Sequence, residues 1–542
     1  MAAVSSRGGR IIGAILAVIV AGWIGSSPAR ADAPRPNIIV ILVDDMGFSD
    51  LGCYGSEIPT PNIDALAAGG LRFTQFYNTC RCCPTRASIL TGLFSHQAGI
   101  GHMTEDKGAP GYRGRLNDNC VTIAQVLQTA GYFTAMTGKW HVGQDFGVVP
   151  WERGFDRSLN APAGGFYFPD ANRAKVYLNG KLVGNHGPEL PKEWYSTDLW
   201  TDFGIKFIDD ALAAKKPFFL YLAHNAPHFP LQAPQEDIAK FRGKYTMGWD
   251  KLRSQRYQRQ IQMGIIDKSW PLSPRPSAVE AWESLSGPEA DRFDFIMSIY
   301  AAVISHMDTS VGRLVAALKE RGQLDNTLIL FLSDNGGNAE SGPRGKLEGS
   351  PAGSVGSTVY EGQSWATLSN TPFRWYKHYN HEGGIATPLI AHWPARIKDG
   401  GQLRTQPGQL VDIMTTCVDL AGATYPAQFK GKDILPMEGR SLVPAFDNKP
   451  IDRKALYWEH EGNRAIRVGD WKLAAVGRNG PWELYNMATD RTELRDLADK
   501  EPQRVKELSD MWEAWALRAH VKPYPDEGGK KKNGKNKKKA AE

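Results

Sequence analysis

The sequence predicts an α/β protein with a large, mainly parallel sheet flanked by helices, followed by a smaller C-terminal antiparallel sheet and a helix. Three observations carry this prediction. Four apolar runs are each followed directly by polar residues, a long amphipathic helix lies between two of them, and after about residue 451 short runs alternate with Gly and Asn turns. Such apolar runs are typical of strands buried on both faces of a parallel sheet. At 542 residues and 42% hydrophobic content, the chain can bury one large core and a smaller one.

The four apolar runs are expected to be strands, and each delivers polar groups directly after its end. The runs are 37–43, 131–137, 217–222 and 327–332, and they are followed by Asp44-Asp45, by Lys139 and His141, by His224 to His228, and by Asp334-Asn335. The carboxyl ends of parallel strands meet at one edge of a sheet, where open α/β folds bind their ligands. Each segment alone is an ordinary strand and loop, but together they predict one shared site.

The clearest helix is expected at about 291–321, because apolar residues recur there at helical spacing and Gly322 provides a stop. His306 and Asp308 lie within it and are interpreted as polar helix residues, not as ligands. A last helix is expected from about 501 to 519. Residues 230–290, with weak periodicity, and the Gly- and Ser-rich 336–370 are expected to be long loops. They would form either the wall of a cleft or a surface excursion.

The amino terminus has the features of a secretory signal peptide. Arg7 and Arg10 precede an apolar run at 11–25, and an Ala-x-Ala cleavage site ends at Ala31. The predicted parts are therefore a signal peptide (1–31), a large catalytic α/β domain (32–450), a smaller C-terminal α+β domain (451–521) and a disordered Lys-rich tail (522–542). The signal predicts a periplasmic or secreted protein with no stable membrane anchor after cleavage; an uncleaved anchor is the alternative.

The net charge of +6 comes from the two ends of the chain. Residues 1–31 contain three arginines and no acidic residue, and residues 522–542 contain eight lysines against three acidic residues. The remaining body therefore carries a small negative charge, which argues against a nucleic-acid-binding protein. The basic tail is expected either to be simply solvated or to touch anionic polymers or lipid headgroups.

Residues 80–92, Cys-Arg-Cys-Cys-Pro-Thr-Arg-Ala-Ser-Ile-Leu-Thr-Gly, contain the most informative motif. Pro84 suits the first turn of a helix, so Cys82 would lie at the helix's amino end. Unpaired N–H groups there stabilise an oxyanion or a nucleophile, and Arg86, one turn further, can point at the same spot. A buried structural cysteine, or metal or disulfide chemistry with Cys80 and Cys83, are the alternatives.

The acidic pairs after two of the strands suggest a metal site. Carboxylate and amide oxygens from Asp44, Asp45, Asp334 and Asn335 would suit a hard divalent cation such as calcium, although a solvated acidic turn is the simpler interpretation of Asp44-Asp45 alone. Lys377 stands five residues before Glu382-Gly-Gly, and by its chemistry alone it is only a lysine in a loop.

Six segments together resemble the sulfatase family of the alkaline phosphatase superfamily. They are Ile-Leu-Val-Asp-Asp-Met-Gly, Cys-Cys-Pro-Thr-Arg, Gly-Lys-Trp-His, Ala-Pro-His, Ser-Asp-Asn-Gly and Lys377 before Glu-Gly-Gly, in the family's order over nearly the whole mature chain. The short sequence segments around these motifs are most similar to those of bacterial arylsulfatases. The family pattern falls on Cys82, since only Cys82 has the right distance to both Pro84 and Arg86. Thr137 is one departure, where the family usually has a small or aliphatic residue.

The resemblance implies a set of residue roles. Cys82 would be oxidised to formylglycine by a formylglycine-generating enzyme and, once hydrated, would be the nucleophile. Asp44, Asp45, Asp334, Asn335 and the modified Cys82 would hold one calcium ion; Arg86 would hold the diol, Lys139 and Lys377 would bind sulfate oxygens, and His141 and His228 would move protons. The implied activity is hydrolysis of sulfate esters, either small aryl sulfates or sulfated carbohydrates.

Two other functions stay open at this point. Related enzymes hydrolyse phosphodiesters or phosphonate monoesters with the same kind of site, and a non-catalytic protein could capture sulfated polymers through its cleft and tail. Conversion of Cys82 would leave five cysteines, Cys53, Cys80, Cys83, Cys120 and Cys417, so at least one thiol would be unpaired within the chain.

Overall fold

The central feature of the fold is a large mixed sheet, seen here in a computed structural model that describes residues 1, 3, 35–171 and 174–525. Its strand order is β12-β2-β11-β8-β1-β7-β3-β4-β5-β6, with β13 paired to β2. The described residues from Arg35 onward form one compact unit. Nearly all of the predicted signal peptide and most of the Lys-rich tail lie outside the described residues. No helix in the described part of the chain is long and apolar enough to cross a membrane.

Strand β1 (Asn37–Val43) lies in the middle of the sheet, between β8 (Thr327–Ser333) and β7 (Phe218–Ala223), and pairs with both in parallel. Strands β3 (Phe133–Lys139) and β4 (Arg157–Ala161) continue the parallel part. The prediction of a mainly parallel sheet is thereby confirmed. Strand β3 begins two residues later than expected because Gly131, with φ of 82°, still belongs to the preceding turn.

On the other side of β8 the sheet turns antiparallel. Strand β11 (Ala386–His392) runs antiparallel to both β8 and β2 (Leu71–Tyr77), and short strands finish the two edges. These edge strands are β12 (Gln402–Arg404), β13 (Gly408–Gln409), β5 (Tyr177–Leu178) and β6 (Lys181–Leu182). Two small antiparallel pairs lie apart from the large sheet, β9 (Lys346–Glu348) with β10 (Thr358–Tyr360) and β14 (Gln428–Phe429) with β15 (Lys432–Asp433).

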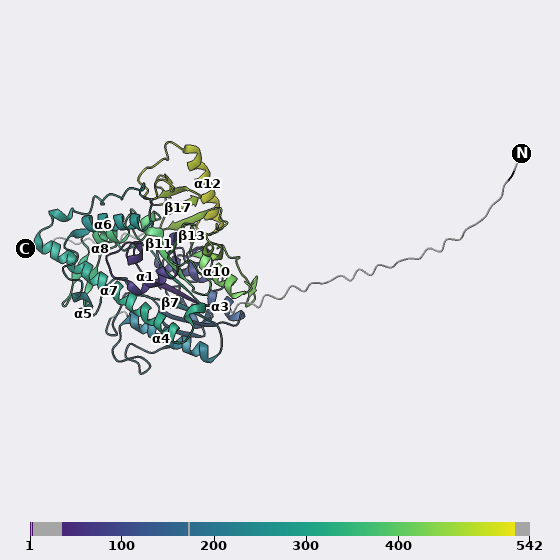
Figure 1. Cartoon of the computed structure of the whole chain (residues 1–542), viewed down its shortest axis with the longest axis horizontal. Coiled ribbons are helices and arrows are strands. Elements are labelled where there is room, and N and C mark those ends of the chain that lie inside the picture. The colour runs from purple at the N-terminus through teal and green to yellow at the C-terminus, as the bar shows by residue number, and fades with distance from the viewer. Residues whose placement is uncertain (2, 4–34, 172–173, 526–542) are drawn as a thin grey trace, which may run out of the picture. The chain divides into compact units, whose positions relative to one another are not determined.

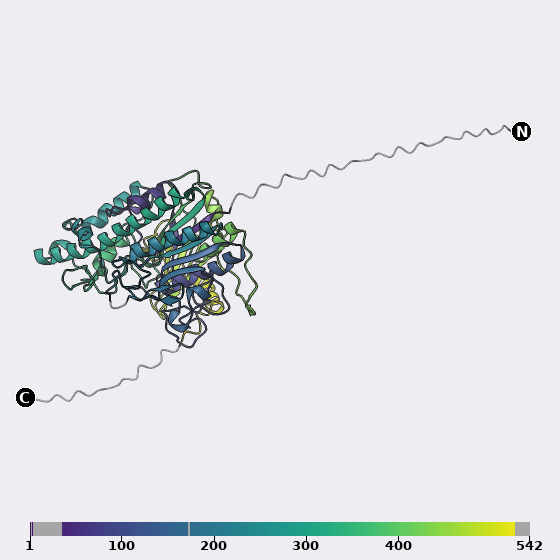
Figure 2. The same cartoon turned by 90° about the horizontal axis from the view of Figure 1, so that it is seen from below.

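Helices cover both faces of the sheet, and β1 shows how the two cores are divided. Ile39, Ile41 and Val43 belong to the core that includes α1 (Pro61–Ala68), α4 (Ser196–Ala213) and α7 (Gly287–Glu320). Ile38, Val40 and Leu42 belong to the opposite core with α2 (Cys82–Thr91), α3 (Ile123–Thr129) and α10 (Val411–Ala421). Side chains of a strand alternate between faces, so a strand covered on both sides is apolar throughout. Figure 1 and Figure 2 show these helical layers around the strands.

The long helix α7 starts four residues earlier than expected, at Gly287. His306 within it bridges two acidic residues, with Nδ1 2.7 Å from Asp237 Oδ2 and Nε2 2.9 Å from Asp198 Oδ2. Asp308 accepts hydrogen bonds from the N–H groups of Asn62 and Ile63. Both residues thus serve helix packing, as their position in the periodic pattern indicated.

The expected loop at 230–290 contains regular structure, which corrects the prediction. It includes α5 (Gln235–Ala239), α6 (Gly248–Gln262) and a 3-10 turn at Trp282–Ser284. Helix α6 packs on α8 (Gly362–Ser369), which lies inside the other expected loop. Its buried face is largely polar: Arg256 is fully buried and pairs with Asp50 at 2.7 Å and Glu57 at 2.8 Å. An apolar periodicity therefore could not reveal this helix.

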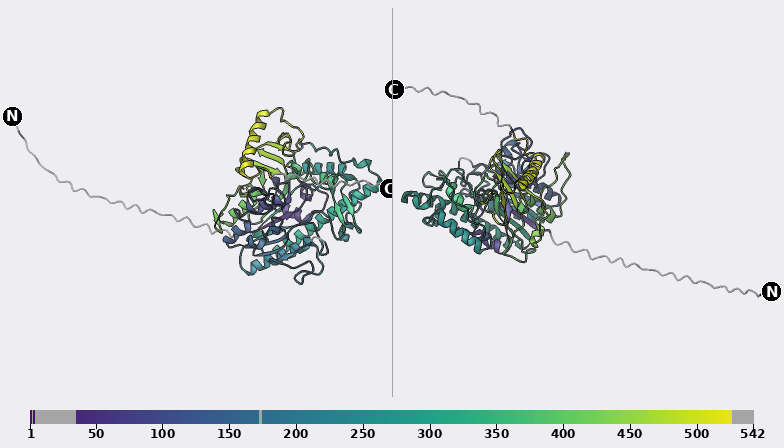
Figure 3. Two further views of the ribbon diagram at one scale, coloured as in Figure 1. Left: turned by 180° about the vertical axis from the view of Figure 1, so that it is seen from behind. Right: turned by 90° about the horizontal axis from the view of Figure 1, so that it is seen from above.

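The C-terminal region is the predicted antiparallel sheet with a helix. Strands β16 (Leu456–His460), β17 (Asn463–Val468), β18 (Trp471–Ala475) and β19 (Glu483–Asn486) pair in sequence order, and α12 (Pro502–Arg518) packs on them. Figure 3 shows α12 alongside these strands. The remaining short helices are α9 (Glu382–Ile385), α11 (Val443–Phe446) and the 3-10 turns Gly52–Tyr54, Gln144–Phe146, Pro150–Glu152 and Leu324–Asn326.

A buried ionic cluster joins this C-terminal sheet to the large sheet. Glu382, at the start of α9, accepts from Lys472 Nζ at 2.9 Å and from Arg491 Nε at 2.8 Å, and all three side chains are buried. Burial opposes ionisation of Glu382, but the charges of Lys472, Arg491 and Arg467 outweigh it and lower its pKa to about 2. The stabilisation from this charge is complete above pH 4.5 and is lost as the pH falls through the folded-state pKa.

Replacing Glu382 with glutamine is expected to lower the free energy of unfolding by about 3–5 kcal/mol, because the buried Arg491 and Lys472 lose a carboxylate and only Lys472 keeps another, Glu493 at 2.7 Å. Urea denaturation followed by tryptophan fluorescence measures this change. The matched control is Glu348→Gln, which breaks an exposed 2.8 Å pair with Lys346 and should change stability by no more than about 0.5 kcal/mol. Equal effects of the two substitutions would contradict the role of the buried cluster.

Candidate active site

The carboxyl ends of four neighbouring strands form the edge of the sheet that carries the candidate site. In spatial order these strands are β8, β1, β7 and β3. They lead into Asp334-Asn335, into Asp44-Asp45, into the loop that contains His228, and into Lys139 and His141. Asp45 and His141 have φ angles of 69° and 54°, a left-handed conformation that is uncommon for residues with a side chain and clusters at functional sites. The polar groups that follow the separate predicted strands therefore lie at one edge.

Cys82 is the first residue of helix α2 and lies at this edge. Arg81 precedes it with extended backbone, and the helix ends at Gly92, whose φ of 66° closes the last turn. Every residue of α2 is buried. The Sγ atom of Cys82 is 3.5 Å from Nδ1 of His141. The unpaired N–H groups at the amino end of α2 therefore surround a reactive position beside a histidine.

Arg86, one turn further along α2, connects three of the strand ends. Its Nη2 atom lies 2.9 Å from Asp334 Oδ2 and 3.5 Å from Asp44 Oδ2, and Nη1 donates to the carbonyl oxygen of Lys139 at 2.9 Å. The side chain is completely buried. Thr85 adds a 2.6 Å hydrogen bond to the carbonyl oxygen of Asp334. Helix α2 is thereby fixed to β1, β3 and β8 at the position where Cys82 begins it.

Two buried lysines form ion pairs with the aspartates that follow β1. Lys139 Nζ donates to Asp44 Oδ2 at 2.6 Å, and Lys377 Nζ contacts both carboxylate oxygens of Asp45, at 2.8 Å and 3.0 Å. His228 Nε2 is 3.7 Å from Asp45 Oδ2. Lys377 comes from a loop far along the chain, so only the fold brings it here. Together with Arg86, Lys139 and Lys377 thus place three positive charges near the amino end of α2.

The residues present fit a hard divalent cation. Among the described residues, Asp44 Oδ1 and Asn335 Oδ1 are buried without any hydrogen-bond partner. Such oxygen atoms cost free energy unless something donates to or coordinates them. Asn335 Nδ2 donates to Asp45 Oδ1 at 2.8 Å, so its carbonyl oxygen points the other way. Oxygen atoms from an aspartate and an amide on neighbouring strands are ligands that calcium prefers.

The charges of the site reinforce this conclusion. Burial opposes ionisation of Asp44, but Lys139, His228 and Arg86 outweigh it and hold its pKa well below the ordinary value. Burial and the nearby Asp44 carboxylate raise the pKa of Asp334 well above its usual range. Two carboxylates this close do not both ionise easily, and a divalent cation between them would favour the ionised form of both.

The pKa of the Cys82 thiol is held well below its ordinary value by hydrogen bonding from Cys83 and by the charges of Lys139 and His141, although burial opposes this. Burial and Lys139 lower the pKa of His141, which favours the neutral imidazole that can accept a proton. Position 82 therefore combines a nucleophilic atom with a neighbouring base.

Two residues near the site had no signal in the sequence analysis. Asn338 Nδ2 donates to Asp45 Oδ2 at 2.7 Å and to Glu340 Oε2 at 3.0 Å. Glu340 in turn lies 3.2 Å from Lys377 Nζ and 2.7 Å from Arg81 Nη1. Asn338 could have been noticed four residues after Asp334, but Glu340 lies in an irregular segment where nothing marks it. Together they position Lys377 and the residue before Cys82.

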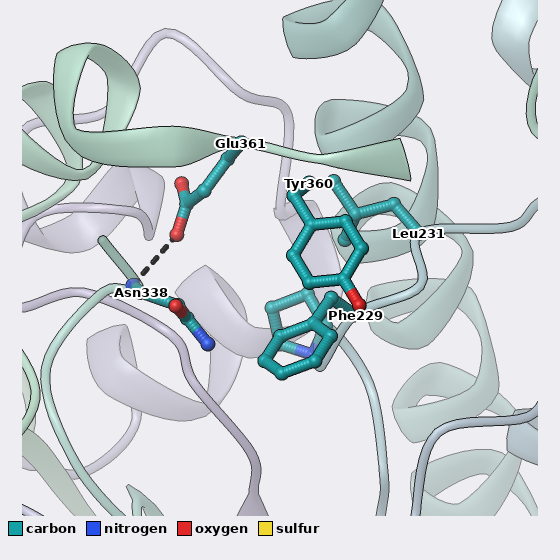
Figure 4. A pocket seen from close by; sticks show the side chains of 6 residues that line it. Phe229, Leu231, Asn338, Tyr360 and Glu361 are labelled. Carbon is teal, nitrogen blue, oxygen red and sulfur yellow. Dashed lines mark hydrogen bonds between the residues drawn. The ribbon is translucent and has the colours of Figure 1, made fainter. Parts of the chain in front are cut away.

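A small pocket adjoins Asn338 and is lined by Pro227, Phe229, Leu231, Asn338, Tyr360 and Glu361. Figure 4 shows the Glu361 carboxylate, which accepts from the backbone N–H of Asn338 at 2.7 Å, and the rings of Phe229 and Tyr360 beside it. Phe229 stacks on Tyr360 and on His228, with 4.3 Å between ring centroids in each pair. The aromatic stack therefore fixes the plane of the His228 imidazole.

Comparisons with known proteins agree with this arrangement. The family model described as Sulfatase matches residues 36–423, and the model described as N-sulphoglucosamine sulphohydrolase, C-terminal, matches residues 372–515. The chain is 35% identical to an arylsulfatase of Klebsiella aerogenes over 467 residues, covering 82% of this chain and 98% of the relative. It is also 35% identical to an uncharacterised sulfatase of Schizosaccharomyces pombe, covering 92% and 96% of the two chains.

Solved structures show the same fold. The crystal structure of Ps i-CgsB in complex with k-i-k-neocarrahexaose matches with a TM-score of 0.67 and 28% identity, covering 90% of this chain and 98% of that chain. The phosphonate monoester hydrolase of Agrobacterium radiobacter matches with a TM-score of 0.55 and 19% identity, which shows a shared fold alone. The family model spans most of the described chain and two relatives exceed 30% identity over nearly their full length, so this protein belongs to the sulfatase family.

Proposed function

We propose that this protein hydrolyses sulfate monoesters, releasing an alcohol or phenol and inorganic sulfate, after Cys82 is converted to formylglycine by a maturation enzyme. The observation that carries the proposal is the position of Cys82 at the amino end of α2, 3.5 Å from His141 and beside Lys139, Lys377 and Arg86. A sulfate ester carries a negative charge, and several fixed positive groups would bind its oxygens and offset the charge that shifts during reaction. Membership of the sulfatase family supports the same reaction class.

Two groups would complete this site. Asp44, Asp45, Asp334 and Asn335, with the modified residue 82, would hold a calcium ion, and the unpartnered oxygens of Asp44 and Asn335 described above support this assignment. When bound, calcium supplies positive charge beside the sulfate oxygens, and hydrated formylglycine supplies one hydroxyl to attack sulfur and a second that lets sulfate leave.

The protein's own residues then bind the ester and move protons. Lys139 and Lys377 would bind sulfate oxygens while they keep their contacts with Asp44 and Asp45. His141 Nδ1 faces position 82, so it would accept a proton from the second hydroxyl of residue 82. His228 Nδ1 is 2.6 Å from the carbonyl oxygen of Phe229 and donates to it, so Nε2 is the nitrogen left to exchange a proton with the leaving oxygen.

Replacing His228 with alanine is expected to lower kcat by roughly 10²–10⁴-fold for a phenyl sulfate, whose leaving group needs a proton. The loss should be much smaller for 4-nitrophenyl sulfate, whose phenolate leaves without one. Steady-state kinetics with a series of aryl sulfates of different phenol pKa measure this difference. His224→Ala, at a buried histidine on the same loop, is the matched control. An equal loss for all leaving groups would exclude His228 as the general acid.

The proposal as a whole is tested by the ratio of two activities of the mature protein, towards an aryl sulfate and towards the matching aryl phosphodiester. A strong preference for the sulfate is expected. A preference for the diester would overturn the substrate class but keep the same catalytic residues. Absence of both activities in protein that carries the aldehyde would instead favour a protein that only binds sulfated polymers.

Within this class we infer either an aryl sulfate or a sulfated carbohydrate as the substrate. The arylsulfatase relative of Klebsiella aerogenes supports the first, and the neighbour that was crystallised with neocarrahexaose supports the second. The predicted signal at 1–31 supports a periplasmic or secreted location. Fractionation of cells that express the full chain checks this location, and retention in the cytoplasm would contradict it.

A further inference from the structure

We propose that His102, His460 and Glu461, with His378 beside them, form a second metal site that binds a divalent transition metal such as Zn²⁺. One ligand atom from each of the first three residues lies within 4.8 Å of the others. His102 lies in the loop between α2 and α3, and the other two lie at the turn between β16 and β17. These residues belong to neither the calcium ligands nor the sulfate-binding groups assigned above.

The strongest indication comes from His460. Its side chain is completely buried, and neither ring nitrogen has a hydrogen-bond partner among the described residues. The nearest carboxylate oxygen, Glu461 Oε1, is 3.7 Å from His460 Nε2, beyond hydrogen-bond distance. Burying an imidazole with both nitrogens unpartnered is costly, and a metal ion would supply the missing partner.

The other side chains converge on the same point. His102 Nδ1 is 3.2 Å from Glu461 Oε1, and His378 Nδ1 is 3.1 Å from Glu461 Oε2. The centroid of the His460 ring is 6.0 Å from that of His102 and 5.8 Å from that of His378. Glu461 and His378 have φ angles of 51° and 82°, and such left-handed conformations are retained where the surrounding structure demands them.

The donor set identifies the kind of ligand. Two imidazoles and one carboxylate, with the His378 imidazole beside them, suit zinc and its neighbours in the first transition series, whereas calcium needs several oxygen ligands. An anionic group, such as a second sulfate of a polymer, would meet the carboxylate of Glu461 at this place, whereas Glu340 and Arg81, 2.7 Å apart, offset each other's charge. The cluster therefore favours a cation over an anion.

A metal here would join the C-terminal sheet to the loops around the candidate active site. Glu340 Oε1 lies 2.8 Å from His378 Nε2 and 2.7 Å from Arg81 Nη1, and its other oxygen is 3.2 Å from Lys377 Nζ. Coordination would hold His378 and Glu340 in one arrangement and thereby fix Lys377 and the residue before Cys82. In this role His102, His378 and Glu461 are positioning residues, since none of them touches the reacting position.

The test uses the full, mature protein stripped of metals with a chelator and then saturated with Ca²⁺. Titration with Zn²⁺ by calorimetry is expected to show one additional site per chain, and Co²⁺ in place of Zn²⁺ should give the visible absorption of a low-coordinate ion with nitrogen ligands. His102→Ala should weaken Zn²⁺ binding by at least about tenfold, because a ligand is lost. His186→Ala removes an exposed histidine that pairs with Asp170 at 2.8 Å, and it should leave Zn²⁺ binding unchanged.

Two more variants test whether Zn²⁺ binds at this cluster or elsewhere in the protein. Glu461→Gln removes the partly exposed carboxylate without touching the core, so it tests the site even if a substitution of buried His460 prevents folding. Cys82→Ala removes a second candidate group, formed by Cys82, Cys83 and His141, and should leave Zn²⁺ binding intact. Saturating Ca²⁺ is expected to occupy the third group, formed by Asp44, Asp45 and His228. Added Zn²⁺ should also raise the Tm of the parent protein but not that of His102→Ala.

The proposal is overturned if the Ca²⁺-saturated protein binds no Zn²⁺, or if His102→Ala and Glu461→Gln both bind it as the parent does. It is equally overturned if the additional site disappears in Cys82→Ala. Absence of Zn²⁺ binding at this cluster would leave the proposed sulfate ester hydrolysis standing, because the proposed nucleophile and calcium ligands lie outside the cluster.

Discussion

Replacing Cys82 with alanine is expected to abolish sulfate ester hydrolysis, with a loss in kcat of roughly 10⁴-fold or more, as found when a covalent nucleophile is removed. The alanine lacks the sulfur that maturation would oxidise, so the nucleophile never forms. The fold should be unchanged, because a buried Cys→Ala substitution removes one atom from a helix start that Arg86 and Thr85 hold in place. Hydrolysis of an aryl sulfate and near-ultraviolet circular dichroism measure the two properties.

Cys83 provides the matched control for this experiment. It is the next residue of α2, it is equally buried, and its Sγ lies 3.7 Å from Met103 Sδ. Cys83→Ala should therefore retain activity within about tenfold of the parent, since it removes packing but no reacting group. Mass spectrometry of the peptide containing residues 80–92 should find the aldehyde on position 82 in active protein. Near-normal turnover by Cys82→Ala would refute the nucleophile assignment.

Removal of calcium is the second change with a large expected effect. Chelation should lower kcat for an aryl sulfate by at least about a hundredfold, because the sulfate oxygens lose their main source of positive charge. Without the cation, the carboxylates of Asp44 and Asp334 also repel each other and the bound anion. Added Ca²⁺ should restore activity, and titration of the stripped protein gives its affinity.

Asn335→Ala tests the same site from the protein side. It removes one of the two unpartnered buried oxygens and should raise the Ca²⁺ concentration needed for half-maximal activity by at least about tenfold. Asp106→Asn, at an exposed aspartate that pairs with Arg115 at 3.0 Å, is the control and should leave this concentration unchanged. Activity that is indifferent to both chelation and added Ca²⁺ would rule out a calcium site at these residues.

The sequence by itself determined the strands that carry the site. Strands β1, β7, β3 and β8 are buried on both faces, so their sequences are mainly apolar and the polar residues that follow them stand out. The sequence also predicted the start of α2 at Cys82, because proline favours the first turn of a helix. Local sequence decides these features, and the structure places the resulting side chains at one edge.

The tertiary structure alone decided the partners that come from distant segments. The antiparallel direction of β11 depends on the connection that precedes it, which an apolar run does not encode. Helix α6 was missed because the buried Arg256 pairs with acidic residues of another segment, so the buried face of the helix is not purely apolar. The contact of Lys377 with Asp45 spans 332 positions of the chain. Likewise, His102 and His460 meet only because the C-terminal sheet packs beside the loop that follows α2. Contacts of this kind arise from packing between elements, and no local pattern of residues records them.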